Sequence, residues 1–179
     1  MKKLLVVVDM QNDFITGALG TKEAQAIVPG VVEFVKGFDG FVVATQDTHN
    51  SDYLDTQEGK RLPVPHCIDG TEGEEIIPEL KNLVVDSEKW DSRLSQPFRK
   101  DTFGSLSLKE WLSMHCQDCE EIHFVGVCTG ICVIANAVIA KTALPEARII
   151  IHKDLCACVT QESHERALKS METLQMDIV

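Results

Sequence analysis

The chain has 179 residues, 44% of them hydrophobic and 25% charged, a composition typical of a globular protein with one core, and we expect a single domain over residues 1–179. Its formal net charge of −11, without a basic cluster to offset it, argues against nucleic acid as a partner. No apolar run approaches the roughly 18 residues that span a bilayer, so we expect no membrane association.

The predicted elements begin with a strand at residues 3–9, whose apolar stretch is shorter than the roughly 7–15 residues of a secretory signal core. We therefore expect a cytoplasmic location, a reducing compartment in which the seven cysteines stay thiols. An amphipathic helix follows over residues 24–36, and Pro29 is expected to interrupt it. Residues 41–46 form the next predicted strand.

The middle of the chain gives a less regular pattern. Helices are predicted over residues 72–80 and residues 106–114. Between them, both "LVVDS" and "QPFRK" have the character of a strand. The sequence leaves open which of the two is the strand.

The last third of the chain returns to alternating strands and helices. Strands are predicted at residues 122–127 and 148–152, and helices at residues 132–142 and 161–174. Thr160 is placed to cap the last helix.

This alternation indicates an α/β fold in which a doubly wound, mostly parallel sheet carries helices on both faces. In such folds, ligands bind beyond the carboxyl ends of the strands. The ends of three predicted strands read "VDMQNDF", "ATQDTH" and "VGVCTGIC", and we expect them to meet at one edge of the sheet.

The stretch "VGVCTGICV" places two cysteines between a strand and a helix. Cys132 lies near the predicted helix N-terminus, where the helix dipole and backbone N–H groups lower the pKa of a thiol and can hold an oxyanion. Cys132 is therefore the candidate nucleophile, and Cys128 would contribute its backbone N–H. The alternative is that both are small buried hydrophobic residues, the commoner role of free cysteine.

Asp9 ends the first predicted strand, where an unpaired buried carboxylate would be costly. A neighbouring thiol would make Asp9 a general base. The alternative, a solvated carboxylate that caps a helix, suits Asp13 better.

A metal site is suggested by "QDTHN" and "LPVPHC". In an extended segment Asp47 and His49 point the same way, and His66 arrives from a loop. Two imidazoles and a carboxylate suit zinc, manganese or iron. The alternative is an ordinary polar loop.

The other cysteines have no assigned role. The pairs in "CQDC" and "CAC" have a spacing that permits a four-thiolate zinc site, but neither lies in a glycine-rich knuckle, so ordinary thiols are favoured. The five residues are Cys67, Cys116, Cys119, Cys156 and Cys158.

Together these stretches resemble the nicotinamidase and isochorismatase-like cysteine hydrolase family. The resemblance rests on "VVDMQNDF", "ATQDTH" with "PVPHCIDGT", "KDTFGS" and "GVCTGICV", which occur in the family's order, and it extends to the tail "DLCACVTQESHERAL". It implies the family's doubly wound sheet of six parallel strands, and homo-oligomers, which are common among its members.

The resemblance also implies a triad of Asp9, Lys100 and Cys132, with the oxyanion held by the backbone N–H groups of Cys128 and Cys132. Lys89 is the rival to Lys100 if "LVVDS" is the strand. The implied reaction is hydrolysis of nicotinamide, or a similar small carboxamide, through a thioester on Cys132. A cis peptide bond is expected just before Cys128, as in relatives.

In nicotinamidases, residues that match Asp47, His49 and His66 hold a metal that binds the pyridine nitrogen of the substrate. Zinc is the expected ion here, with manganese or iron as alternatives. Water or one more side chain would complete the site. The candidates for that side chain are Asp52, Asp55 and Glu58.

Two departures from the family pattern concern the substrate. Gly130 stands where nicotinamidases often have an aspartate in T-D-x-C-V, and "PVPH" stands where many have W-P-P-H, which removes a ring that can stack on pyridine. Phe14 remains as a candidate apolar wall. The alternatives are a hydrolase of another amide or ureido compound and a non-catalytic metal-binding module.

Overall fold

The computed structural model describes residues 2–84 and 96–179, and its centre is a six-stranded sheet in the order β3-β2-β1-β4-β5-β6. All neighbouring strands run parallel. The strands are β1 (Lys3–Val8), β2 (Phe41–Asp47), β3 (Phe98–Lys100), β4 (Glu121–Val127), β5 (Arg148–Ala157) and β6 (Asp177–Ile178). The middle strands are buried on both sides, which explains their continuous apolar runs.

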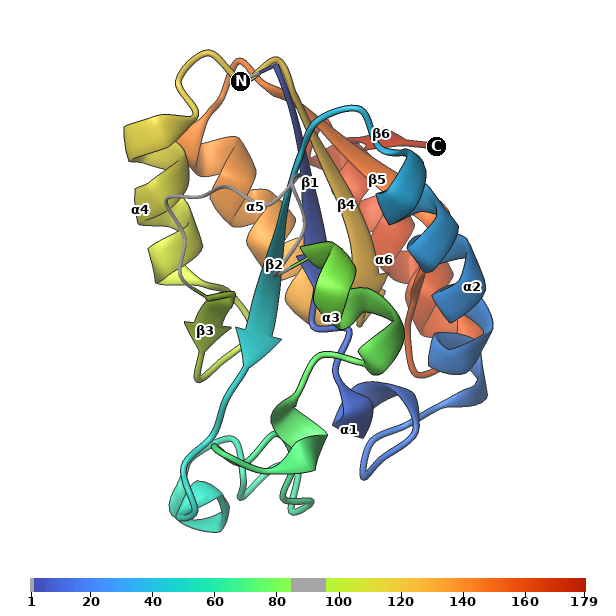
Figure 1. Cartoon of the computed structure of the whole chain (residues 1–179), viewed down its shortest axis with the longest axis vertical. Helices are drawn as coiled ribbons and strands as arrows, with labels where there is room; N and C mark the ends of the chain where they lie inside the picture. Colours follow the sequence, from blue (N-terminus) through green and yellow to red (C-terminus); the bar gives the residue numbers. More distant parts are fainter. Residues whose placement is uncertain (1, 85–95) are drawn as a thin grey trace.

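Helices cover both faces of this sheet. Figure 1 shows α2 and α3 in front of the strands and α4, α5 and α6 behind them. The α-helices are α1 (Asn12–Ile15), α2 (Lys22–Gly37), α3 (Pro78–Val84), α4 (Leu106–His115), α5 (Ile134–Ala143) and α6 (Gln161–Thr173). Short turns are η1 (Tyr53–Asp55), η2 (Glu72–Glu74) and the π-helical η3 (Thr129–Val133). The predicted doubly wound α/β fold is confirmed.

Helix α2 does not break at Pro29, contrary to the prediction. Pro29 faces solvent, while Ala24, Val31 and Val35 on the opposite side of the helix are buried against the sheet. Burial of this apolar face holds the helix together despite the hydrogen bond that a proline cannot make.

Within the described residues, the strand of the undecided region between residues 83 and 100 is "QPFRK", and the part of "LVVDS" beyond Val84 lies outside them. Leu83 and Val84 end helix α3, whereas β3 covers Phe98–Lys100. The predicted start of the helix over residues 72–80 was wrong, because this segment contains the short turn η2 and then the beginning of α3. Helix α3 begins at Pro78, a residue well suited to the first helical position. Lys89 lies outside the described residues.

Strand β5 extends further than the prediction, to Ala157. The register between β4 and β5 shifts after Phe124, and pairing resumes with Gly126 beside Cys156 and Val127 beside Ala157. The predicted cap of α6 is confirmed, because the Thr160 side chain accepts a hydrogen bond from the backbone of Ser163.

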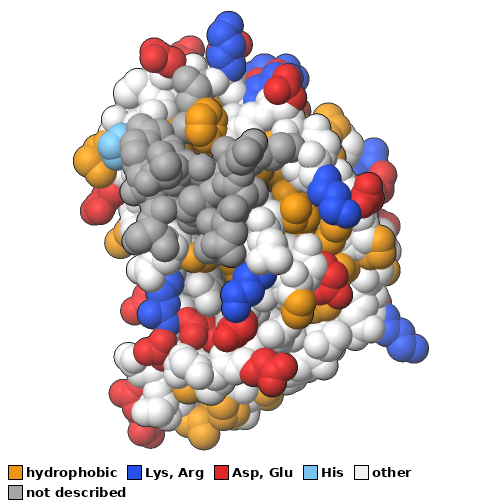
Figure 2. All heavy atoms as spheres, viewed as in Figure 1, with side chains coloured by type: hydrophobic (Ala, Val, Ile, Leu, Met, Phe, Trp, Pro, Cys, Tyr) orange, Lys and Arg blue, Asp and Glu red, His pale blue; other side chains and the backbone are white. Residues whose placement is uncertain are grey.

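No helix in the described ranges is both long and apolar enough to cross a membrane. On the face of the molecule in Figure 2, acidic side chains gather toward the lower end. The same end carries the carboxyl termini of β1 and β2 and the loop over residues 48–77 (Figure 1).

A pair of histidines links β4 and β5 at the other end of the sheet. Nδ1 of His123 lies 2.9 Å from Nε2 of His152, and the rings stack. His152 also packs on Phe34, with ring centroids 4.3 Å apart. Burial, with the neighbouring His123, lowers the pKa of His152 to about 4.

This shift predicts a loss of stability in mild acid. As pH falls, the unfolded chain binds a proton at His152 near pH 6.5, before the folded chain does, so the stabilisation is complete above that pH and is lost toward pH 4. After allowance for solvent screening, the free energy of unfolding should fall by roughly 1 kcal/mol from this source between pH 7 and pH 5. Urea unfolding of wild type and His152→Gln at both pH values measures this change in the free energy of unfolding.

The exposed His115 supplies the matched control, His115→Gln. The His152→Gln variant should lose less stability than wild type between the two pH values, and the control should behave as wild type. An identical pH dependence in all three proteins would contradict the assignment.

Candidate active site

The candidate site lies beyond the carboxyl ends of four neighbouring strands. Asp9 follows β1, Asp47 ends β2, Lys100 ends β3, and Cys132 lies in η3 after β4. The predicted meeting of the strand ends at one edge of the sheet is confirmed (Figure 1). The parallel register brings the residues together, since Asp47 pairs directly with Lys100.

Asp9, Lys100 and Cys132 are in mutual contact. The Lys100 Nζ lies 2.7 Å from Oδ2 of Asp9 and 3.6 Å from Sγ of Cys132. Asp9 and Cys132 also interact directly through a side-chain hydrogen bond. The hydroxyl of Thr45 donates to Oδ1 of Asp9 at 2.6 Å and fixes the carboxyl group. All three side chains are at least nine-tenths buried.

The electrostatics of this cluster favour a basic carboxylate beside a permanent cation. Burial raises the pKa of Asp9 above its usual value, although the charge of Lys100 opposes this. Burial alone would lower the pKa of Lys100, but Asp9, Cys132 and Asp47 outweigh it, and the pKa of Lys100 lies above its usual value. Asp9 is therefore a stronger base than an exposed aspartate, and Lys100 stays charged.

The expected low pKa of Cys132 was wrong. Helical structure begins at Thr129, not near Cys132, so the sulfur does not occupy the first helical position. Burial, followed by the charge of Asp9, raises the pKa of Cys132 well above its usual value, and Lys100 only partly opposes this. The residue rests as a thiol, and its proton has to leave when the sulfur attacks.

The turn that carries Cys132 follows a cis peptide bond and is held by the side chain of Asn136. The Val127–Cys128 peptide bond is cis, as the resemblance implied. Asn136, which sequence reasoning missed, donates from Nδ2 to the carbonyl of Cys132 at 2.8 Å. The same side chain accepts a hydrogen bond from the backbone N–H of Ser105 at 2.9 Å. The signal that could have found Asn136 is a polar residue within an apolar helix face.

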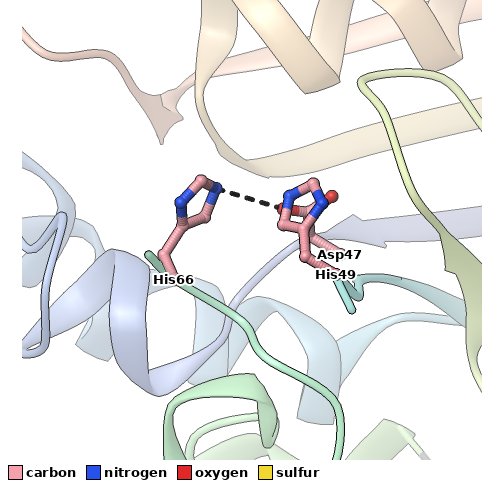
Figure 3. Close-up of side chains that lie close together, drawn as sticks. All are labelled: Asp47, His49 and His66. Carbon is pink, nitrogen blue, oxygen red and sulfur yellow. Dashed lines mark ion pairs between the residues drawn. The ribbon is translucent and has the colours of Figure 1, made fainter. Parts of the chain in front are cut away.

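Asp47, His49 and His66 form a compact group of possible metal ligands. Their ligand atoms all lie within 4.8 Å of one another, and all three residues are buried. In Figure 3 the ring of His66 faces the Asp47 carboxylate, which lies directly beside the ring of His49. Oδ2 of Asp47 lies 2.9 Å from Nε2 of His49 and 3.5 Å from Nε2 of His66.

This group fits a divalent cation. Nε2 of His49 is buried and makes no well-aligned hydrogen bond, although it lies close to Asp47. The ring of His66 uses its other nitrogen, since Nδ1 lies 2.8 Å from the carbonyl oxygen of Val64, the arrangement common in metal-ligating histidines. Two imidazoles and one carboxylate suit zinc in particular.

The charges of the group agree with this reading. Burial would raise the pKa of Asp47, but the nearby imidazoles of His49 and His66 and the charge of Lys100 bring it below its usual value. Of the three candidates for a further ligand, Glu58 is the nearest, with Oε1 3.9 Å from Nε2 of His49. The other two candidates, Asp52 and Asp55, are exposed.

Gln11 fixes the backbone of Asp47, and sequence reasoning missed it. Its Nε2 donates to the carbonyls of Asp47 and Glu74, at 2.8 and 2.7 Å, and its Oε1 accepts from the Asp47 N–H at 2.7 Å. Tyr53 packs against both imidazoles, with ring centroids 4.6 Å from His49 and 5.0 Å from His66. The buried polar Gln11 within "DMQNDF" is the signal that could have indicated this role.

A cavity of about 320 Å³ opens in front of the nucleophile. Cys132 borders it together with Asp47 and His66. Phe14 lies on its wall, where the sequence placed it, and its role in substrate binding stays a prediction. The remaining apolar wall residues are Leu19, Leu62, Phe103, Cys128, Ile131 and Val159. Sequence reasoning missed Leu62 and Phe103, which lie in the loops around "PVPH" and "KDTFGS".

Sequence comparison places the chain among known proteins. The family model of the isochorismatase domain matches residues 3–179. An uncharacterised isochorismatase family protein, PncA, from Bacillus subtilis is 33% identical over 176 residues, which cover 94% of this chain and 93% of that protein. A nicotinamidase/pyrazinamidase from Mycobacterium tuberculosis is 26% identical, with coverage of 99% and 98%.

Solved structures agree with the sequence relatives. The crystal structure of nicotinamidase PncA from Bacillus subtilis superposes with a TM-score of 0.83 at 29% identity, covering both chains completely. A pyrazinamidase from Pyrococcus horikoshii in complex with zinc gives a TM-score of 0.80 at 27% identity, covering 100% of this chain and 99% of that one. The chain therefore belongs to the isochorismatase family.

Proposed function

We propose that this chain hydrolyses nicotinamide, or a closely similar small carboxamide, to the carboxylic acid and ammonia through a thioester on Cys132. The observation that carries the proposal is the contact of Asp9, Lys100 and Cys132 at the bottom of a cavity that is also bordered by the metal-ligand group. The relatives named nicotinamidase or pyrazinamidase support the same reaction class.

In the first half of the reaction, Asp9 accepts the thiol proton of Cys132 as the sulfur attacks the carboxamide carbon. The raised pKa of Asp9 suits it to this transfer. Lys100, at 3.6 Å from the sulfur, stabilises the developing thiolate by its charge and does not act as a base. The backbone N–H groups of Cys128 and Cys132 hold the oxyanion, an interaction of about 3–4 kcal/mol per donor in comparable hydrolases.

In the second half, Asp9 gives its proton to the departing ammonia and then activates a water molecule for hydrolysis of the thioester. Thr45 keeps the carboxyl group in place for both transfers. Phe14 borders the same cavity and would form an apolar wall for the bound acyl group.

Asp47, His49 and His66 would hold a divalent metal, zinc being the ion that their chemistry fits best. The ion would supply a Lewis-acid site for a heteroaromatic nitrogen of the substrate. Glu58 is the candidate for one more protein ligand. The zinc in the structure of the Pyrococcus pyrazinamidase supports this choice of ion.

The test of the proposal is ammonia release from nicotinamide, measured on a sample whose metal content is determined by elemental analysis. We expect turnover together with close to one bound divalent ion per chain. A metal-loaded protein that releases no ammonia from nicotinamide or pyrazinamide would contradict the proposed substrate class.

Removal of the metal should impair substrate binding more than the chemical step. The ion would bind the substrate ring, so chelation is expected to raise KM by at least about tenfold, and added zinc should restore it. The double variant His49→Ala with His66→Ala should lose the bound metal in elemental analysis. Glu33→Ala, which removes an exposed acid far from the site, is the control and should retain the metal. Unchanged KM in metal-free protein would refute the positioning role.

A second candidate substrate class is the ureido compounds. An N-carbamoylsarcosine amidase from Thermoplasma acidophilum superposes with a TM-score of 0.78 at 25% identity. This chain also lacks the aromatic ring expected before the "PH" of "PVPH", and its cavity wall is aliphatic at Leu62 and Ile131. A panel of nicotinamide, pyrazinamide and N-carbamoyl amino acids, read by ammonia release, distinguishes the two classes.

We further propose a cytoplasmic location, a role in NAD salvage and a homo-oligomeric state. Sedimentation of the purified protein tests the last of these.

A further inference from the structure

Two cysteines outside the triad face each other at the ends of β4 and β5. Gly126 pairs with Cys156 and Val127 with Ala157, and Cys128 and Cys158 directly follow the last of these pairs. Neighbouring strands lie roughly 4.8 Å apart. That spacing falls within the Cα separations of about 4.4–6.8 Å that disulfides bridge. Both residues are free thiols in this structure.

The sulfur of Cys158 is surrounded by polar groups. The thiol of Cys128, the side chain of Ser163 and the backbone groups of Gly130 and Val159 all interact with it. These interactions, of which the bond from Cys128 is the largest, lower the pKa of Cys158 to about 5. The same contact, with burial, raises the pKa of Cys128. The surroundings therefore favour the thiolate at Cys158 and the thiol at Cys128.

This pair differs from the other cysteines outside the triad. Burial raises the pKa of Cys67, Cys119 and Cys156. A buried thiol of that kind reacts slowly with oxidants, because the thiolate is the nucleophile. Compared with these three residues, Cys158 has surroundings that favour reaction.

The pair also connects the surface to the catalytic cavity. Cys158 borders two surface hollows, of about 270 and 350 Å³, through which a small oxidant can reach it. Cys128 borders the cavity that contains Cys132. A Cβ atom added at Gly130 would lie 3.7 Å from the Cys158 sulfur, so this sulfur lies next to the turn that carries the nucleophile.

We propose that Cys128 and Cys158 form an oxidation site in which hydroperoxides convert the two thiols to a disulfide, and that this disulfide suppresses the hydrolase activity. The Cys158 thiolate attacks one oxygen of hydrogen peroxide, which yields a sulfenic acid and hydroxide. The Cys128 sulfur then displaces hydroxide from the sulfenic sulfur, its proton leaves with that hydroxide as water, and the S–S bond forms. Two electrons pass from the two thiols to the peroxide.

The disulfide would act on the turn that carries the nucleophile. The carbonyl of Cys128 accepts hydrogen bonds from the backbone N–H groups of Ile131 and Val133, at 3.0 and 3.1 Å. A bond that draws Cys128 toward Cys158 shifts this turn and, with it, the N–H groups proposed for the oxyanion. This second part rests on the proposed function, whereas formation of the disulfide does not.

The disulfide is tested first by mass spectrometry, without an activity assay. The Cys132→Ala variant is treated with hydrogen peroxide, so that the nucleophile cannot react. We expect a mass loss of about 2 Da, reversed by dithiothreitol. Cleavage after Lys, Arg and Glu gives peptides 122–141 and 154–162, and fragmentation should place the link between Cys128 and Cys158. A link to Cys156, or oxidation at other cysteines only, would overturn the proposal.

The effect on activity is tested with single substitutions in the full chain. Cys158→Ser should keep basal turnover and lose activity to peroxide at least roughly tenfold more slowly than wild type. Cys119→Ser, which replaces a buried thiol outside the pair, should be inactivated as fast as wild type, and dithiothreitol should restore both wild type and this control. Equal inactivation of Cys158→Ser and wild type would overturn the suppression. If no variant hydrolyses any amide, the disulfide test in Cys132→Ala still decides the first part.

Discussion

Substitution of Cys132 by alanine is expected to abolish hydrolysis of nicotinamide and to lower kcat/KM by at least about 10⁴-fold. The side chain supplies the attacking sulfur, and no described neighbour can replace it in contact with both Asp9 and Lys100. The measurement is ammonia release at saturating and limiting substrate. Because alanine removes only one buried sulfur atom, the thermal unfolding midpoint should change little.

A trapping experiment separates this role from a structural one. Nicotinaldehyde should form a reversible thiohemiacetal on Cys132, which mass spectrometry detects in wild type and not in Cys132→Ala. Cys119→Ser serves as the matched cysteine control and should trap the aldehyde as wild type does. Full activity of Cys132→Ala would refute the nucleophile assignment, and an unreactive thiol in wild type would favour a non-catalytic metal-binding module.

The sequence was sufficient to predict the sheet and the strand ends. Strands buried on both faces have to be apolar throughout, so "LLVVV" and "FVVA" can be recognised as strands without knowing which strands they pair with. Polar residues that directly follow such runs, as Asp9 and Asp47 do, have to lie at one edge of a parallel sheet. Their convergence follows from topology, whatever the details of packing.

Features that depend on long-range packing could not be predicted in this way. Strand β3 has only three residues, so its apolar pattern was too short to choose between "LVVDS" and "QPFRK". The pKa of Cys132 was misjudged because burial by residues distant in sequence outweighs the local helix terminus. Gln11 and Asn136 act through hydrogen bonds to backbone groups 36 and 31 residues away, and a single sequence does not specify such partners.

Lys100 connects the triad to the metal-ligand group. Its Nζ lies 2.7 Å from Asp9 and 3.0 Å from Oδ1 of Asp47, so one cation is shared by the proposed base and a proposed metal ligand. A metal bound by Asp47 would offset the negative charge of that carboxylate, so the carboxylate would attract Lys100 less strongly. Lys100 would then interact more strongly with Asp9 and the thiolate of Cys132, which is the state required for attack.

Asp9→Asn should lower kcat/KM by about 10³–10⁴-fold, the second largest effect that we expect. Asparagine keeps the shape of the side chain but cannot accept the proton of Cys132 or pass it to the departing ammonia. The rate of alkylation of Cys132 by iodoacetamide should not fall with the activity, because loss of the Asp9 charge lowers the pKa of Cys132 while Lys100 still stabilises its thiolate.

The control for Asp9→Asn is Asp101→Asn, an exposed aspartate directly after Lys100. It removes the same charge from the chain without touching the cluster, and we expect wild-type rates in both assays. Wild-type turnover in Asp9→Asn would refute the role of Asp9 as proton acceptor. A loss of alkylation parallel to the loss of turnover would show instead that the substitution disturbs Lys100 or the sulfur itself. The paired readouts therefore separate the loss of proton transfer by Asp9 from damage to the nucleophile, which a loss of activity alone cannot do.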